Sequence, residues 1–201
     1  MLNGKTILVT GGTGSFGNAF TQYVLEHYEP KKSLFIPEMN FKQILIWQIK
    51  SKKYKGQLTF HFIGDCVAIR RELYRAFDGV DYVVHAAALK QVPACEYNPM
   101  EAVKTNIDGA MNIVDAALDC GVKRVVALST DKAVNPINLY GGTKLVSDKL
   151  LLQQMHIQEQ RMYVFPSCDM EMLPEAVALL SHFSGKLLQM VEKNFQLQII
   201  V

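Results

Sequence analysis

A phenol and an ammonium group lie one helical turn apart in this sequence. Tyr140 and Lys144 fall four residues apart in a stretch with helical spacing of apolar residues, which places both on one helix face. A nearby ammonium stabilises a phenolate and lowers the phenol pKa from about 10 toward neutrality. The pair could therefore serve as an acid and base in hydride chemistry, although Tyr-x-x-x-Lys alone is a weak indication because it recurs by chance.

A second reactive cluster lies ten residues upstream of the tyrosine. Thr130, Asp131 and Lys132 directly follow a β-branched run at 124–129 that predicts a buried strand. Ligands of open α/β sheets bind at the carboxyl ends of such strands. Thr130 can hydrogen-bond a reacting hydroxyl or carbonyl group, and Asp131 and Lys132 add an acid and a base that simple hydride transfer does not need. The alternative for these two is a solvated pair of loop residues.

A glycine-rich segment follows the first predicted strand, at 6–10, and begins the first predicted helix. Gly11, Gly14 and Gly17 allow a tight turn, close approach to a pyrophosphate and close packing of helix on sheet. The free N–H groups at the helix start favour an anion, and Ser15 can donate one more hydrogen bond. The strand–loop–helix context favours a dinucleotide site over a glycine-rich turn that binds nothing.

Two acidic residues at later strand ends extend the dinucleotide prediction. A further strand is expected to end near residues 35–40. Glu38 lies there, could accept from a ribose 2′-hydroxyl and would favour NAD, although Pro37 and Met39 are unusual neighbours. Asp65 ends another strand-like run and is placed to contact an adenine. The alternative for Asp65 is a simple strand-end cap.

Strand-like and helix-like segments alternate along most of the chain. β-branched runs at 6–10, 59–63, 82–85 and 124–129 are typical of strands buried on both faces, and stretches with helical spacing lie between them. The alternation predicts an α/β fold with a Rossmann-like, doubly wound parallel sheet. We expect a dinucleotide-binding domain over 1–156 and an aberrant C-terminal segment over 157–201. One more strand is expected over 158–165 and one helix over 173–191, with no normal substrate lobe.

The composition is that of an ordinary globular protein, with 49% hydrophobic residues, 20% charged residues and a net charge of +2. The balance of 21 basic and 19 acidic residues gives no reason to expect a nucleic-acid or membrane partner. Four separated cysteines form no C-x-x-C pair, so neither a metal site nor a disulfide framework is expected. The sequence shows neither a signal peptide nor an apolar run of membrane-spanning length, and a cytoplasmic location is expected.

The glycine loop, Asp65, Thr130 and the Tyr140/Lys144 pair together resemble the extended short-chain dehydrogenases/reductases. Residues 86–96, 104–106 and 129–136 resemble more narrowly the inverting UDP-N-acetylglucosamine 4,6-dehydratases of polysaccharide biosynthesis. The resemblance covers residues 1–33 and 73–151, and the Asp-Lys form of the loop is its specific feature.

The resemblance implies a tightly held NADP, with NAD as the alternative, and a UDP-sugar substrate. It implies substrate contacts from Lys90 and Asn106. The cofactor contacts that it implies are Thr10, Gly11, Gly14, Ser15, Phe16, Gly17, Asp65, Ala86, Ala87, Ala88, Tyr140 and Lys144.

The reaction that the resemblance implies is a lyase step with Thr130, Asp131, Lys132, Tyr140 and Lys144 as catalytic residues. By this resemblance Tyr140, assisted by Lys144, takes the C4 hydroxyl proton as hydride leaves C4. Lys132 then removes the C5 proton, and Asp131 protonates the departing C6 hydroxyl. Hydride finally returns to C6. An acid and a base on one loop suit elimination better than oxidation alone. Two alternatives remain, a UDP-sugar 4-epimerase and a truncated dinucleotide-binding module without turnover, and a homo-oligomer is compatible with each.

Three stretches depart from the family pattern, around residues 35–41, at 66–71 and from 165 onward. Codons can be written for 35–41 whose shifted frame reads Tyr-Ser-Arg-Asp-Glu-Phe, which is family-like. Codons for 165–178 similarly give Ser-Val-Val-Arg-Tyr-Gly-Asn-Val-Ala-Gly-Ser-Arg-Gly. We therefore hypothesise a dehydratase reading frame that carries frameshifts, a hypothesis that the coding DNA across codons 33–75 and 153–201 tests. The arginine expected to hold the NADP 2′-phosphate is among the missing residues, so NADP rests on the resemblance.

Overall fold

A computed structural model describes residues 2–36, 58–60, 70–157 and 161–166 of the chain. These residues form a six-stranded sheet in the order β3-β2-β1-β4-β5-β6, and every pairing is parallel. The strands are β1 (Thr6–Thr10), β2 (Lys32–Ile36), β3 (Leu58–Phe60), β4 (Tyr82–His85), β5 (Arg124–Ser129) and β6 (Arg161–Pro166). The predicted α/β, doubly wound parallel sheet is confirmed. The strand expected over 158–165 is β6, the edge strand beside β5.

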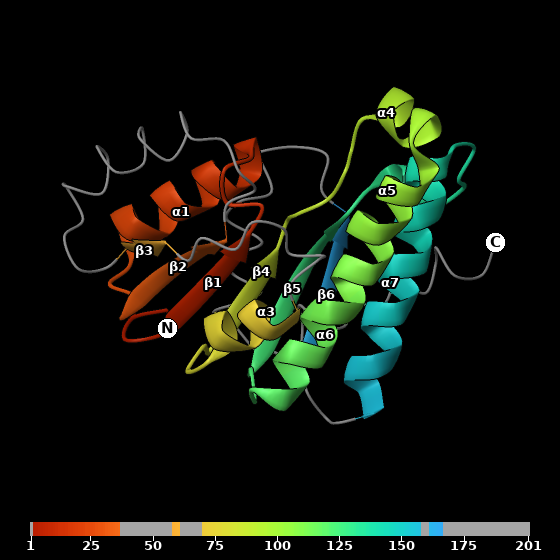
Figure 1. The fold of residues 1–201 in the computed structure, drawn as a ribbon. Coiled ribbons are helices and arrows are strands. Elements are labelled where there is room, and N and C mark those ends of the chain that lie inside the picture. Colours follow the sequence, from red (N-terminus) through yellow and green to blue (C-terminus); the bar gives the residue numbers. More distant parts are fainter. Residues whose placement is uncertain (1, 37–57, 61–69, 158–160, 167–201) are drawn as a thin grey trace, which may run out of the picture.

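Helices cover both faces of the sheet, as alternating strands and helices require (Figure 1). The chain reverses its direction across the sheet between β3 and β4, so α1 lies on one face while α3, α6 and α7 lie on the other. The helical segments are α1 (Ser15–His27), α3 (Arg70–Phe77), α4 (Val92–Tyr97), α5 (Pro99–Val103), the π turn η1 (Lys104–Asp108), α6 (Gly109–Asp119), the 3₁₀ turn η2 (Asp131–Ala133) and α7 (Leu139–Ile157).

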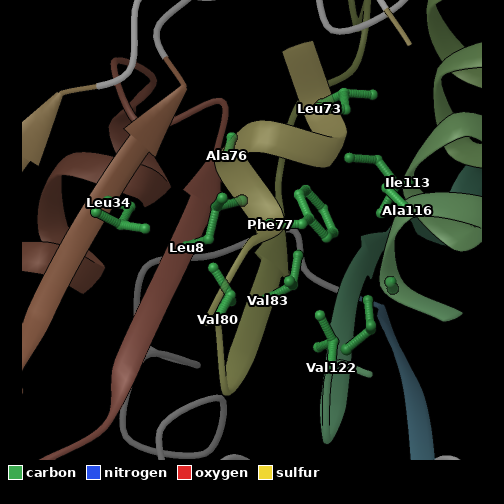
Figure 2. Packing of buried hydrophobic residues seen from close by; sticks show 12 residues of the cluster. Leu8, Leu34, Leu73, Ala76, Phe77, Val80, Val83, Ile113, Ala116 and Val122 are labelled. Atoms are coloured by element: carbon green, nitrogen blue, oxygen red, sulfur yellow. The ribbon is translucent and has the colours of Figure 1, made fainter. Parts of the chain in front are cut away.

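The main hydrophobic core lies between the sheet and the α3/α6 layer (Figure 2). Leu8, Val83 and Val125 occupy one register level of β1, β4 and β5, and all three belong to this core. Phe77 of α3 and Ile113 of α6 are fully buried in the same core. The strands are therefore fixed against one another by hydrogen bonds within the sheet and by apolar packing on this face.

The division at residue 156 stays a prediction, because most of the segment 157–201 lies outside the described residues. The helix expected over 173–191 falls there too. Within the described ranges, no helix has the length and apolar character needed to cross a membrane.

Replacing Phe77 with alanine should lower the free energy of unfolding by about 3–5 kcal/mol, because the change leaves a cavity in the core. Tyr97→Ala is the matched control: this aromatic side chain is 92% exposed, and its loss should cost within about 0.5 kcal/mol. Urea denaturation followed by circular dichroism measures both. Equal losses in the two variants would contradict the placement of Phe77.

Candidate active site

The candidate site is formed where neighbouring parallel strands end. Thr10 ends β1 and lies in register with His85, the last residue of β4, and His85 lies in register with Ala127 of β5. The glycine loop, the segment after β4 and the loop after β5 therefore leave the sheet at one edge. This is the edge at which open α/β sheets bind ligands.

The glycine loop packs directly against backbone. Gly11 has a φ of +65°, and a Cβ there would lie 2.7 Å from the carbonyl carbon of Ala86 and from the nitrogen of Ala87. A Cβ on Gly17 would lie 2.5 Å from the Gly11 oxygen. The Gly14 N–H donates to that same oxygen at 3.0 Å and closes the turn. At positions 11 and 17, larger residues are excluded by contact with backbone.

The first turn of α1 has N–H groups that can donate to a ligand. Gly14 is its N-cap residue, and no side-chain cap is present within the part of the chain that the structure describes. Ser15 is exposed beside it, and Phe16 stacks on Phe20 with ring centroids 5.8 Å apart. The Asn18 side chain donates to the carbonyl oxygens of Thr13 and Gly14, at 2.7 and 2.8 Å. Asn18, which was not among the predicted site residues, thus fixes the glycine loop to the first turn of α1. A glycine-lined cradle at a helix start without a side-chain cap among the described residues fits a pyrophosphate.

A buried histidine joins the glycine loop to β4. The Thr10 hydroxyl and Nδ1 of His85 are hydrogen-bonded at 2.7 Å, and the Ala87 N–H donates to the same hydroxyl at 3.4 Å. Burial lowers the pKa of His85 to about 3, and the charges of Lys144 and Lys90 act in the same direction. The imidazole is therefore neutral at pH 7. His85 was not among the predicted site residues, whereas Thr10, Ala86 and Ala87 were.

The loop after β5 holds its acid and base side by side. The buried Thr130 hydroxyl donates to Oδ1 of Asp131 at 3.0 Å and accepts from the Lys132 N–H at 3.4 Å. Oδ1 of Asp131 lies 3.5 Å from Nζ of Lys132. The two charged side chains are 68% and 49% exposed, so this pair is accessible to a substrate.

Helix α7 begins directly on this loop. A Cβ on Gly141 would collide with the carbonyl oxygen of Lys132, so the glycine permits helix and loop to touch. The Asn138 side chain accepts from the Gly141 N–H at 2.9 Å, and Oε1 of Glu96 accepts from the Leu139 N–H at 2.7 Å. These caps fix the first turn of α7, which carries Tyr140.

Tyr140 and Lys144 are both buried, on one face of α7 as predicted. Nζ of Lys144 donates to the carbonyl oxygen of Leu128 at 2.8 Å. Burial lowers the pKa of Lys144, Asp148 opposes that shift, and Lys90 adds to it. Asp148 is a further residue that the sequence analysis missed, although its position one turn beyond Lys144 was a readable signal.

Lys90 lies in the loop between β4 and α4, and Asn106 lies in the π turn η1, which contacts α7 through Thr143. Lys90 is exposed, and its charge acts on both His85 and Lys144. Asn106 is buried within the π turn: its Oδ1 accepts from the Leu89 N–H at 2.8 Å, and its Nδ2 donates to the Leu89 oxygen and to Oγ1 of Thr143, each at 3.0 Å. In the structure Asn106 thus positions this segment on α7, and its contact with a substrate stays a prediction.

Several predicted features lie outside the described residues. Asp65 and Glu38 are among them, as are the segments 37–41, 66–69 and 167–178 that support the frameshift hypothesis. Their roles stay predictions. Within the described ranges, no three His, Cys, Asp or Glu side chains gather as a metal site would require.

The family can be read from a match that spans the whole sheet. The sequence profile described as "Polysaccharide biosynthesis protein" matches residues 7–167, from β1 through β6. The chain belongs to this family. It is 50% identical over 157 residues to the UDP-N-acetylglucosamine 4,6-dehydratase (inverting) of Campylobacter jejuni subsp. jejuni serotype O:23/36 (strain 81-176), covering 78% of this chain and 46% of that relative. A UDP-glucose 4-epimerase of Rickettsia massiliae (strain Mtu5) is 44% identical over 161 residues, covering 77% of this chain and 45% of the relative.

Solved structures agree with the fold of this family member. Pen from Bacillus thuringiensis superposes with a TM-score of 0.74 and 32% identity, over 81% of this chain and 49% of that protein. DesIV, a dTDP-glucose 4,6-dehydratase from Streptomyces venezuelae solved with NAD, gives a TM-score of 0.70 at 23% identity, over 79% of this chain and 54% of that protein, and supports the fold alone. The chain spans about half the length of the curated relatives that it matches.

Replacing Gly11 with alanine should lower the free energy of unfolding by about 2–5 kcal/mol, because left-handed strain adds to a collision with Ala86 and Ala87. Gly79→Ala is the matched control, since its φ is +69° but nothing lies within 4 Å of the added Cβ. The control should cost only about 1–2 kcal/mol. Urea denaturation measures both, and equal costs would disprove the close approach at Gly11.

The neutral His85 predicts a specific loss of stability in acid. The pKa of its ring is 6.5 unfolded and about 3 folded, so the unfolded chain binds more protons between these values and stability falls as pH decreases. From pH 7 to pH 5 this group alone should remove about 2 kcal/mol from the free energy of unfolding. His85→Gln cannot titrate, so its stability should depend less steeply on pH by that amount. Parallel pH curves for the two proteins would contradict a buried neutral ring.

Proposed function

We propose that this chain acts in nucleotide-sugar 4,6-dehydration of the inverting UDP-N-acetylglucosamine type, within polysaccharide or glycan biosynthesis. NADP as dinucleotide, a UDP-sugar substrate and a cytoplasmic location form part of the proposal. The observation that carries it is the seating of the Thr130–Lys132 loop on Gly141, because this contact brings an exposed acid and base beside the helix of Tyr140. The 50% identity to a dehydratase supports the same reaction.

The glycine cradle supports a dinucleotide at the start of α1. The backbone at Gly11 and Gly14 would follow the pyrophosphate, and the free N–H groups of the first turn would donate to it. The bound dinucleotide supplies an acceptor, and later a donor, of hydride. All proton transfers are left to side chains of the protein.

Tyr140 and Lys144 suit the oxidation at C4 of the sugar. The Tyr140 phenolate takes the hydroxyl proton, and the ammonium of the buried Lys144 favours that phenolate. Thr130 would hydrogen-bond the same sugar oxygen. The ketone that forms makes the neighbouring C5 proton acidic, which prepares the elimination.

Asp131 and Lys132 suit the elimination across C5 and C6. Lys132 removes the C5 proton, and Asp131 gives a proton to the C6 hydroxyl, which departs as water. Hydride would then return to C6, and one proton would be added at C5 to balance the proton that Tyr140 took from the C4 hydroxyl. The dinucleotide would end as it began, and the net reaction would be the loss of water. A 4-epimerase would need Tyr140 and Thr130 but not this pair, which is why the pair favours dehydration over the epimerase reaction named for the Rickettsia relative.

Lys132→Ala should abolish formation of the 4-keto-6-deoxy sugar while sparing C4 oxidation, because only the elimination uses this amine. The purified chain is incubated with UDP-N-acetylglucosamine and NADP. Loss of water is followed by mass spectrometry, a C4 epimer of equal mass by ¹H NMR, reduced dinucleotide by absorbance and dinucleotide binding by calorimetry. Lys31→Ala, an exposed lysine before β2, is the control and should behave as the unsubstituted chain.

Each contrary outcome of this assay has a defined meaning. Undiminished 4-keto-6-deoxy product from Lys132→Ala would disprove dehydration by this loop. A C4 epimer in place of that product would assign the epimerase reaction. Dinucleotide binding without either product, in the unsubstituted chain, would leave a binding module without turnover.

A further inference from the structure

Two side chains one turn apart on α7 fasten this helix to the end of β5. Nζ of Lys144 donates to the Leu128 carbonyl oxygen at 2.8 Å, and the Ser129 hydroxyl donates to Oδ2 of Asp148 in a short hydrogen bond. Lys144 is 3% exposed and Asp148 8% exposed. A lysine and an aspartate are thus held together beneath the candidate active site, and the function proposed above assigns a role only to the lysine.

The buried ammonium of Lys144 needs a compensating charge. Removing an ammonium from water costs so much free energy that an unpaired buried lysine loses its proton instead. The charged and titratable groups that act on Lys144 in the described part of the chain come from two directions. His85, which is neutral, ends β4, and Lys90 lies in the segment after β4. Asp148 belongs to α7 itself. Of these, Asp148 is the group that favours the charged ammonium.

The two carboxylate oxygens of Asp148 have different surroundings. Oδ2 accepts from Ser129, whereas Oδ1 lies 3.8 Å from Nζ of Lys144. Oδ1 is buried and has no hydrogen-bond partner among the described residues. Burial raises the pKa of Asp148, while Lys144 and the Ser129 hydrogen bond oppose that shift. An oxygen without a partner facing an ammonium is the arrangement expected of a counter-ion.

We propose that Asp148, oriented by Ser129, is the counter-ion that keeps Lys144 charged and thereby a positioning residue for the acid/base step at Tyr140. Asp148 acts through Lys144 and need not touch substrate or cofactor. The part that concerns Tyr140 rests on the proposed function; the part that concerns the charge of Lys144 does not. Ser129 has a defined share in this arrangement, because it fixes the carboxylate with Oδ1 toward the lysine.

Asp148→Asn separates the electrostatic role from the fastening role. Asparagine has the same shape and still offers a carbonyl oxygen to the Ser129 hydroxyl, so α7 stays fastened while the negative charge is lost. Without that charge, burial and Lys90 should drive Lys144 to lose its proton at lower pH. A neutral Lys144 no longer stabilises the Tyr140 phenolate.

The test is an NMR titration of the full 201-residue chain, without dinucleotide or substrate. Lysine labelled with ¹³C at Cε reports each ammonium, and the Lys144→Met variant identifies the signal of Lys144. We expect Asp148→Asn to lower the titration midpoint of Lys144 by about one unit or more. Asp119→Asn, which removes a carboxylate from α6 that accepts from Tyr74, is the control and should leave the midpoint unchanged.

A second measurement decides the proposal even where Asp148→Asn fails to fold. Aspartate labelled with ¹³C at Cγ reports the ionisation of Asp148 in the unsubstituted chain. The proposal requires an ionised Asp148 at pH 7, and a protonated carboxyl there would overturn it. An unchanged or higher Lys144 midpoint in a folded Asp148→Asn chain would overturn it equally.

Activity provides an independent arm. If the unsubstituted chain forms product, Asp148→Asn should shift the rising limb of the pH–rate profile to higher pH. A merely structural loss would instead lower the rate at every pH. If the Lys132→Ala assay disproves dehydration, the NMR result for Lys144 is unaffected, because no substrate is present in the NMR measurement. The two proposals therefore fail separately.

Discussion

The hydrogen-bond ladder between β1, β4 and β5 is the constraint on which the site depends. Leu8 lies in register with Val83 and Val83 with Val125, and two residues later Thr10 lies level with His85. Alternation along a strand returns to the same face every second residue, so the ladder that packs the apolar trio into the core also brings the Thr10 hydroxyl to the His85 ring. A slip of one residue would turn each side chain to the opposite face and separate the pair.

Beyond the sheet, the loops of the site are joined in sequence by close contacts. Gly11 packs against the backbone of the segment after β4. Asn106 hydrogen-bonds to Leu89 of that segment and to Thr143 of α7, and so links the two. The first turn of α7 rests in turn, through Gly141, on the loop after β5. The contacts at Gly11 and Gly141 require the absence of a Cβ. The third contact is made by the buried side-chain amide of Asn106, which hydrogen-bonds to Leu89 and Thr143. The candidate dinucleotide cradle and the candidate catalytic side chains are thus parts of one connected framework.

The sequence was sufficient for the features that depend on local pattern. β-branched runs predicted the parallel strands, and glycine spacing predicted the loop at Gly11 because a tight turn and a close approach are both written in neighbouring residues. His85 and Glu96 were missed for the opposite reason. The partners of these two residues lie 75 and 43 positions away in the chain, and only the folded topology brings them together. Asp148 was missed for another reason. Its spacing of four residues from Lys144 can be read from the sequence, but its burial cannot.

The two proposed acid/base pairs differ in burial in a way that suits the different tasks proposed for them. Tyr140 and Lys144 are withdrawn from water, which strengthens the effect of an ammonium on a phenol. Asp131 and Lys132 form an ion pair of 3.5 Å, and their side chains are 68% and 49% exposed. In the proposed elimination the sugar would have to lie against this pair, because an acid and a base must each be within hydrogen-bond reach of the group with which they exchange a proton. A bound sugar would also displace water from the loop, which strengthens the electrostatic interactions between the pair and the sugar.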